Sequence, residues 1–181
     1  GAVIVLFNPW STPSPKKPLP MSLLALASVL EGEFALTIVD GNLEADAVGR
    51  ILAIHSATPL AAVAVTVMPG PQLRAAVASC RQLKQILPGV PIIWGGYFPS
   101  QHADACLSES TVDICVRGQG EATVLELCRA MRDGSPLSAV AGRGDVMKLM
   151  EEIFFSFTMG GETLSLAAAK ATLNKLQREP V

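Results

Sequence analysis

Five short apolar runs alternate along this chain with segments of helical periodicity, and this alternation restricts the fold more than any other feature. The runs typical of strands lie at residues 2–7, 36–39, 61–67, 91–94 and 113–116. The segments with helical spacing lie at residues 21–30, 44–55, 71–87, 101–107 and 121–132. Strands joined by helices run parallel, because the crossover returns the chain to the same end of the sheet. We therefore predict a doubly wound α/β domain with a five-stranded parallel sheet.

The length and composition suit one packed domain followed by a short tail. The chain has 181 residues, of which 50% are hydrophobic and 17% charged, and its net charge is −2. A domain commonly holds roughly 100–150 residues, so we expect one over residues 1–135 and a helical tail over 136–181. Because no basic stripe is present, we expect no nucleic-acid partner. Because no apolar run approaches the ~20 residues of a membrane span, we expect no membrane partner.

The four cysteines have no spacing typical of a metal site. Cys80, Cys106, Cys115 and Cys128 are separated by intervals of 26, 9 and 13, which match no zinc or iron–sulfur pattern. Each lies among apolar neighbours, as a buried free thiol does. We therefore expect reduced structural thiols, a cytoplasmic location and no protein-bound metal or iron–sulfur cluster.

Glycine recurs in the loops that follow the predicted strands. These loops lie at residues 8–10, 40–42, 68–71, 95–98 and 118–121, and four of them contain glycine. In a doubly wound sheet, ligands bind outside the carboxyl ends of the strands. Glycine would let a large ligand approach the backbone there, although glycine is also ordinary in tight turns between a strand and a helix.

Three classes of function are compatible with such a sheet. A Rossmann dinucleotide site needs G-x-G-x-x-G after the first strand, whereas this strand ends at Asn8 before a proline. A flavodoxin-type phosphate loop is suggested by Ser11, Thr12 and Ser14, but the surrounding prolines leave few backbone donors. The alternatives are a site for a large flat or tailed ligand, a flavodoxin-like site for FMN or another nucleotide-tailed cofactor, and an interaction domain without a ligand.

A set of motifs in order gives a more specific resemblance over residues 3–142. They read VLFNP, PLPMSLLALASVLE, IVDGN, VTVMPGPQLRAA, VPIIWGGYFPS and DICVRGQGEATVLEL. This stretch resembles the N-terminal cobalamin-binding domain of cobalamin-dependent radical SAM proteins. The resemblance implies a Rossmann-like, flavodoxin-like fold with the corrin ring over the carboxyl edge of the sheet. It also implies that the dimethylbenzimidazole tail lies between the loops after the third, fourth and fifth strands.

The resemblance assigns the cofactor-binding residues to the five loops. The candidates are Asn8, Pro9, Asp40, Asn42, Thr66, Val67, Met68, Gly70, Gln72, Gly95, Gly96, Tyr97, Phe98, Pro99, Ser100, Gly118, Gln119, Gly120 and Glu121. No catalytic residue is assigned among them.

The sequence departs from this family at three motifs. Phe98 stands where the family often has histidine in Gly-Gly-x-His-Pro-Thr, and Gln119 replaces an acid in Gly-Glu-Gly-Glu. The D-x-H-x-x-G motif that supplies a histidine to cobalt is missing, and His55 and His102 have surface or capping positions. We therefore expect base-off cobalamin without a protein ligand to cobalt. The C-x-x-x-C-x-x-C motif of radical SAM chemistry is also missing, so we expect a cofactor carrier rather than a complete enzyme.

Residues 136–181 resemble a different family. The stretch ending in SFTMGGETLSLAAAKATLNKLQREPV resembles class III aminotransferases similar to glutamate-1-semialdehyde aminomutase. The resemblance implies a pyridoxal phosphate contact at Thr158, but none of Lys148, Lys170 and Lys175 matches the Schiff-base lysine. We expect two helices at 145–153 and 162–178, no bound pyridoxal phosphate, and apolar residues that would allow self-association. A natural fusion, a rearranged gene and an assembly artefact all remain open.

Overall fold

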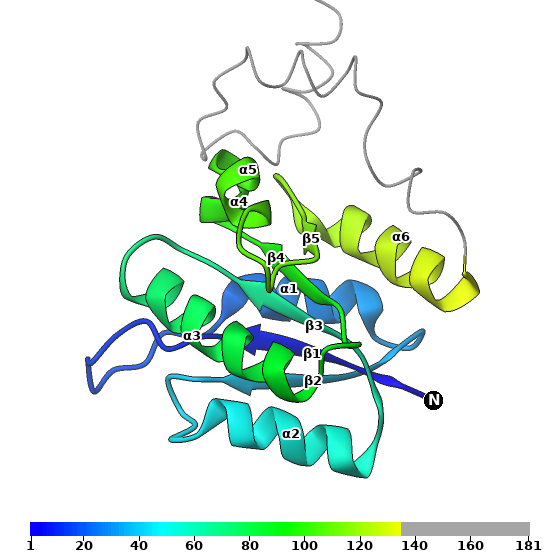
Figure 1. The fold of residues 1–181 in the computed structure, drawn as a ribbon, viewed down its shortest axis with the longest axis horizontal. Coiled ribbons are helices and arrows are strands. Elements are labelled where there is room, and N and C mark those ends of the chain that lie inside the picture. Colours follow the sequence, from blue (N-terminus) through cyan, green and yellow to red (C-terminus); the bar gives the residue numbers. More distant parts are fainter. Residues whose placement is uncertain (135–181) are drawn as a thin grey trace, which may run out of the picture. The chain divides into compact units, whose positions relative to one another are not determined.

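The computed structural model of the chain describes residues 1–134. A five-stranded parallel sheet lies at the centre of this part, in the order β2-β1-β3-β4-β5 (Figure 1). Its strands are β1 Val3–Asn8, β2 Ala35–Asp40, β3 Leu60–Thr66, β4 Ile92–Gly95 and β5 Ile114–Cys115. The predicted parallel sheet and its flavodoxin-like strand order are therefore confirmed.

Two pairs of long helices cover the sheet. α1 (Met21–Leu30) contacts α6 (Gly120–Asp133), and α2 (Ala47–Ala57) contacts α3 (Pro71–Ile86). In Figure 1, α3 crosses in front of the sheet and α1 behind it, as a doubly wound fold requires. None of the helices within residues 1–134 is long and apolar enough to cross a membrane.

The core explains why the strand sequences are continuously apolar. All six residues of β1 are buried, because helices pack on both of its faces. On the α2–α3 side, the indole of Trp94 is 1% exposed and its Nε1–H donates to the Sγ of Cys80 at 3.3 Å. Cys80 lies on the stripe of α3 that faces the sheet, together with Ala76 and Leu83.

The segment between β4 and β5 differs from the prediction. The predicted helix at 101–107 is two single-turn helices, α4 (Tyr97–Gln101) and α5 (Ala103–Leu107), which meet at His102. The chain enters α4 directly from the glycine turn, because Gly96 has φ +101°. His102 has φ −134° and ψ 45°, which is not helical and interrupts the path.

The second helix also begins later than predicted. Residues 44–55 have helical spacing, but α2 starts at Ala47. The carboxylate Oδ1 of Asp46 accepts a hydrogen bond from the backbone N–H of Gly49 at 2.8 Å and caps the helix. The segment before Asp46 therefore stays in the loop that follows β2.

All four cysteines are free thiols, as predicted. Cys80, Cys106 and Cys128 are buried and Cys115 is half-buried. Burial raises the pKa of Cys80 and of Cys115 to about 12, and that of Cys128 to about 11. Thiols with such pKa values are protonated near neutral pH and therefore unreactive.

The carboxyl edge of the sheet as the candidate binding site

The loops after β1, β2 and β3 are joined by a buried network of polar side chains. The amide Nδ2 of Asn8 donates to Oδ1 of Asp40 at 2.9 Å, and the backbone N–H of Asn42 donates to the same oxygen at 2.9 Å. Gln72 donates from Nε2 to Oδ1 of Asn8 at 2.7 Å and accepts the backbone N–H of Met68 at 2.9 Å. Asn8, Asp40, Asn42 and Gln72 are at most 9% exposed. Because buried polar groups are costly unless bonded, this network holds the three loops in one arrangement.

Asn42 also organises the proline-rich loop after β1. Its Oδ1 accepts the backbone N–H of Ser11 at 2.9 Å and that of Thr12 at 3.3 Å, and its Nδ2 donates to Oγ of Ser11 at 3.0 Å. The backbone N–H of Ser14 donates to Oγ1 of Thr12 at 3.1 Å. The amides that a phosphate loop would offer are therefore bonded within the protein.

The glycine turn after β4 lies directly against the end of β3. The backbone N–H of Val67 donates to the carbonyl of Gly95 at 2.8 Å, and that of Phe98 donates to the carbonyl of Val67 at 3.1 Å. A Cβ at Gly96 would lie 3.2 Å from Oγ1 of Thr66 and from the backbone N and O of Val67. We expected the glycines to make room for a ligand, but Gly96 makes room for the neighbouring strand end.

Ser100 ties the loop after β5 to the loop after β4. The hydroxyl of Ser100 donates to the carbonyl of Gly96 at 2.6 Å and accepts the backbone N–H of Gly118 at 2.9 Å. A Cβ at Gly118 would meet no atom within 4 Å, so this turn does leave open space. Gly120 instead lies close to α1, since its Cβ would be 3.3 Å from Cδ2 of Leu26.

The predicted residues fall into three groups by their accessibility. The buried members lie at the ends of β1 and β2 or just beyond them, at the start of α3, directly after β3 and in α4. They are Asn8, Pro9, Asp40, Asn42, Gln72, Val67 and Pro99. The exposed members lie after β3, β4 and β5; they are Met68, Gly70, Tyr97, Gly118 and Gln119. The half-buried members are Thr66, Gly95, Gly96, Phe98, Ser100, Gly120 and Glu121. The exposed residues of the predicted set therefore lie on the β3–β5 side of the edge.

Neither histidine lies within the five predicted loops. His55 lies near the start of β3, at the opposite end of the sheet, where its Nδ1 accepts the backbone N–H of Leu60 at 3.3 Å. The ring of His102 packs against Phe98 with a centroid distance of 4.9 Å, and Phe98 itself packs against the core. Residues 1–134 contain no group of three His, Cys, Asp or Glu side chains that could hold a metal ion.

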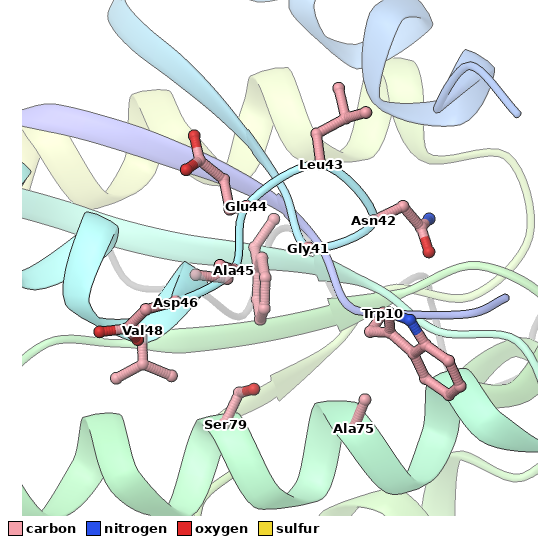
Figure 2. Close-up of a pocket in the computed structure, with 12 residues that line it drawn as sticks. Trp10, Gly41, Asn42, Leu43, Glu44, Ala45, Asp46, Val48, Ala75 and Ser79 are labelled. Carbon is pink, nitrogen blue, oxygen red and sulfur yellow. The ribbon is translucent and has the colours of Figure 1, made fainter. Parts of the chain in front are cut away.

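A hollow of about 510 Å³ lies beside the β1–β2 half of the edge, between the loop after β2 and α3. In Figure 2, Ala75 and Ser79 of α3 face the loop from Gly41 to Asp46, and Trp10 lies at one end. Of the predicted residues, Asn42 alone lines this hollow. The sequence signal for it is weak, because small residues one helical turn apart, such as Ala75 and Ser79, are common on packed helices.

Comparisons with known proteins agree with this fold. The B12 binding domain family matches residues 14–128. A 61-residue stretch is 41% identical to the anaerobic magnesium-protoporphyrin IX monomethyl ester cyclase of Synechocystis sp.. The fold is similar to the radical S-adenosylmethionine methyltransferase TsrM from Kitasatospora setae, with a TM-score of 0.65 and 22% identity over 78% of the chain. It is also similar to the cobalamin-dependent S-adenosylmethionine radical enzyme OxsB, with a TM-score of 0.64 and 17% identity over 75% of the chain.

The relatives are much longer than this chain. The match spans 12% of the cyclase, 28% of TsrM and 19% of OxsB. The likeness to the two solved enzymes concerns the fold, and it corresponds to the doubly wound sheet described above. The family match covers the loops after β2, β3, β4 and β5. The chain belongs to the family of B12-binding domains.

Proposed function

We propose that this chain binds cobalamin at the β3–β5 side of the carboxyl edge. The match to the B12-binding domain over residues 14–128 carries this proposal, because it includes all three of the accessible loops. The cofactor lies against the loops at residues 66–70, 95–100 and 118–121. Met68 is 49% exposed and Tyr97 is 38% exposed, so apolar surface is available for a large, flat ligand.

The buried polar residues of the site have a supporting role. Asn8, Asp40, Asn42 and Gln72 use their side chains to bond one another and the loop backbones. A ligand that replaced those bonds would have to break a satisfied network, which is unfavourable. We therefore infer that these four residues position the loops and do not contact the cofactor.

The bound cofactor is base-off, with no protein histidine on cobalt. His55 supports this proposal because its ring accepts a hydrogen bond near the start of β3. His102 supports it because its ring lies against Phe98. The position at which the family often has histidine is occupied here by Phe98, a residue packed against the core.

A flavin is a weaker candidate for this site. FMN-binding loops offer backbone N–H groups to a phosphate, but Asn42 and Thr12 already accept the N–H groups of Ser11, Thr12 and Ser14. Binding a phosphate here would therefore require rearrangement of the loop after β1. An interaction domain without a ligand remains the other alternative, and it predicts no cofactor spectrum at all.

The chain carries the cofactor but not the reaction of its longer relatives. Cys80, Cys106, Cys115 and Cys128 lack the C-x-x-x-C-x-x-C spacing of a radical SAM cluster, and their pKa values are raised by burial. We infer that the chain alone does not turn over S-adenosylmethionine. A parent activity of the methyltransferase type would depend on residues beyond this domain.

Residues 136–181 are dispensable for cobalamin binding in this proposal. They lie outside the described residues, and so do the two helices predicted there, the resemblance to aminotransferases and the position of Thr158. All the proposed cofactor contacts come before residue 122. A chain that ends at residue 135 should therefore keep the cofactor affinity of the full chain, and pyridoxal phosphate should bind neither form.

Reconstitution with hydroxocobalamin and, separately, with FMN tests the proposal. We expect about one equivalent of cobalamin with a shifted corrin spectrum, and no retained flavin. The His55→Ala/His102→Ala variant should keep the same affinity and spectrum. Retention of FMN alone, or of neither ligand, would reject cobalamin binding. Nitrogen hyperfine coupling from imidazole in the EPR spectrum of the Co(II) form would reject the histidine-free state.

A further inference from the structure

The hydroxyl of Ser100 lies between the two glycine loops that follow β4 and β5. It donates its proton to the carbonyl of Gly96 at 2.6 Å and accepts the backbone N–H of Gly118 at 2.9 Å. A serine hydroxyl has one proton to donate and lone pairs to accept, so the donor and one acceptor site are both engaged within the protein. The side chain is half-buried. Its polar atom is thus directed toward the two loops rather than left for a ligand.

The loop after β5 has little other support from the sheet. β5 is an edge strand of two residues, Ile114–Cys115, and pairs with β4 at two positions. The last backbone bond from this segment to β4 is donated by the N–H of Val116 to the carbonyl of Trp94 at 2.8 Å. Beyond it, Gly118 and Gln119 are exposed. The bond to Ser100 therefore fixes an amide that the short strand does not reach.

The other side of the Ser100 bond is rigid. Gly96 has φ +101°, and a Cβ there would lie 3.2 Å from Oγ1 of Thr66 and from the backbone of Val67. The backbone N–H of Phe98 also donates to the carbonyl of Val67 at 3.1 Å. The loop after β4 is thus held against the end of β3. The hydrogen bond from Gly118 to Ser100 then holds the loop after β5 in place relative to it.

We propose that Ser100 is a positioning residue that couples the two loops before the cofactor binds. This inference rests on the proposed cobalamin site, since both loops belong to it. When the loops are coupled, binding does not have to order them separately, and less conformational entropy is lost. Ser100 itself does not contact the cofactor; it acts through the backbone of Gly96 and Gly118.

Two substitutions at Ser100 and one matched control test the proposal. Ser100→Ala removes the hydroxyl, whereas Ser100→Thr keeps it. Ser56→Ala is the control. Oγ of Ser56 donates to the carbonyl of Leu52 at 3.0 Å, and Ser100 likewise donates to the carbonyl four residues earlier, that of Gly96. Ser56 differs in that its bond stays within α2 and does not join two loops. For each full-length protein we would measure the dissociation constant for hydroxocobalamin, well below the unfolding temperature, and the amide exchange of Gly118 without cofactor.

We expect Ser100→Ala to weaken cobalamin binding about fivefold, the equivalent of one lost hydrogen bond of ~1 kcal/mol. The Gly118 amide should exchange faster in that variant, and Ser100→Thr and Ser56→Ala should stay within about twofold of the wild type in affinity. Wild-type affinity in Ser100→Ala, or equal weakening in Ser56→Ala, would overturn the positioning role while leaving cobalamin binding intact. A wild-type protein that binds no cobalamin would reject the proposed function, and the role of Ser100 with it.

Discussion

The carboxyl edge of the sheet has two halves that use their polar groups differently. Around β1 and β2, the side chains of Asn8, Asp40, Asn42 and Gln72 bond one another and are at most 9% exposed. Around β3, β4 and β5, the loops are tied mainly through backbone groups and Ser100, and Met68, Tyr97 and Gln119 are exposed. In one half the predicted polar side chains are already engaged in a buried network, and we call it the closed half; in the other half, predicted residues lie at a surface that a ligand can reach.

This difference separates residues that a motif alone places together. Asn8 ends β1 and Gly118 follows β5, and both lie in motifs of the family, but the first is buried in a network and a side chain at the second would meet open space. Substitutions in the first half should therefore change the free energy of unfolding. Substitutions in the second half should change the affinity for cobalamin instead.

The largest effect should come from breaking the closed half. Asn8→Ala removes two buried hydrogen bonds, one donated to Asp40 and one accepted from Gln72. Asp40 then keeps the N–H of Asn42, and Nε2 of Gln72 keeps only its longer bond to the carbonyl of Pro9 at 3.3 Å. We expect the free energy of unfolding to fall by about 2–3 kcal/mol, measured by urea denaturation. Gln82→Ala, at an exposed position of α3, should change it by less than about 0.5 kcal/mol. A similar small change in Asn8→Ala would contradict the structural role of the network.

A smaller effect, on binding alone, should come from blocking the open half. The double variant Met68→Trp/Gln119→Trp places bulk at two exposed positions, and we expect at least a tenfold loss of cobalamin affinity, about 1.4 kcal/mol. The control, Leu19→Trp/Leu43→Trp, adds the same bulk at positions that are 73% exposed near the closed half. Spectroscopic titration should show wild-type affinity in the control. Equal losses in the two double variants would remove the distinction between the halves.

The smallest effect should come from an ion pair that belongs to neither half. Just before β2, Glu33 accepts hydrogen bonds from Arg129 and Arg132 of α6 at 2.7 and 3.0 Å. The hydrogen bond from Arg129 is the main reason that the pKa of Glu33 falls from 4.5 to about 2, and Arg132 lowers it further. Because folding lowers this pKa, the stabilisation is complete above pH 4.5 and disappears as the pH falls toward 2.

The pH dependence of unfolding checks this pair. Glu33→Gln should be slightly less stable than the wild type at pH 7, and the difference should shrink toward pH 2 and with added salt, because the pair is exposed. Glu31→Gln, two residues earlier at an exposed position, is the control and should show neither trend. Cobalamin affinity should be unchanged in both variants. A difference for Glu33→Gln that persists at pH 2 would assign its effect to packing.

The strands were predictable because burial on both faces leaves a local signature. Each buried strand is a short apolar run, and α3 showed its apolar stripe clearly enough to be predicted at 71–87 and found at Pro71–Ile86. The path from Tyr97 to Leu107 was predicted only in part: α5 falls within the predicted helix at 101–107, whereas α4 was missed because it depends on the contact of Gly96 with the end of β3. That contact joins residues about thirty positions apart, and local periodicity does not record it.

The division of the site into two halves was also beyond the sequence. Gln72 bonds Asn8 across 64 residues, and Ser100 bonds Gly118 across 18 residues. The same amide or hydroxyl could equally well contact a ligand, so the residue type does not distinguish the two roles. The motif residues lie at the carboxyl edge of the sheet, and the hydrogen bonds show which of them are already engaged within the protein.

Amide hydrogen exchange with and without hydroxocobalamin tests the central claim most directly. If the β3–β5 half binds the cofactor, protection should increase in residues 66–70, 95–100 and 118–121. Residues 8–12 and 40–46, in the closed half, should exchange at the same rate in both states. Protection confined to the closed half, or no change anywhere in the presence of saturating cobalamin, would contradict this account.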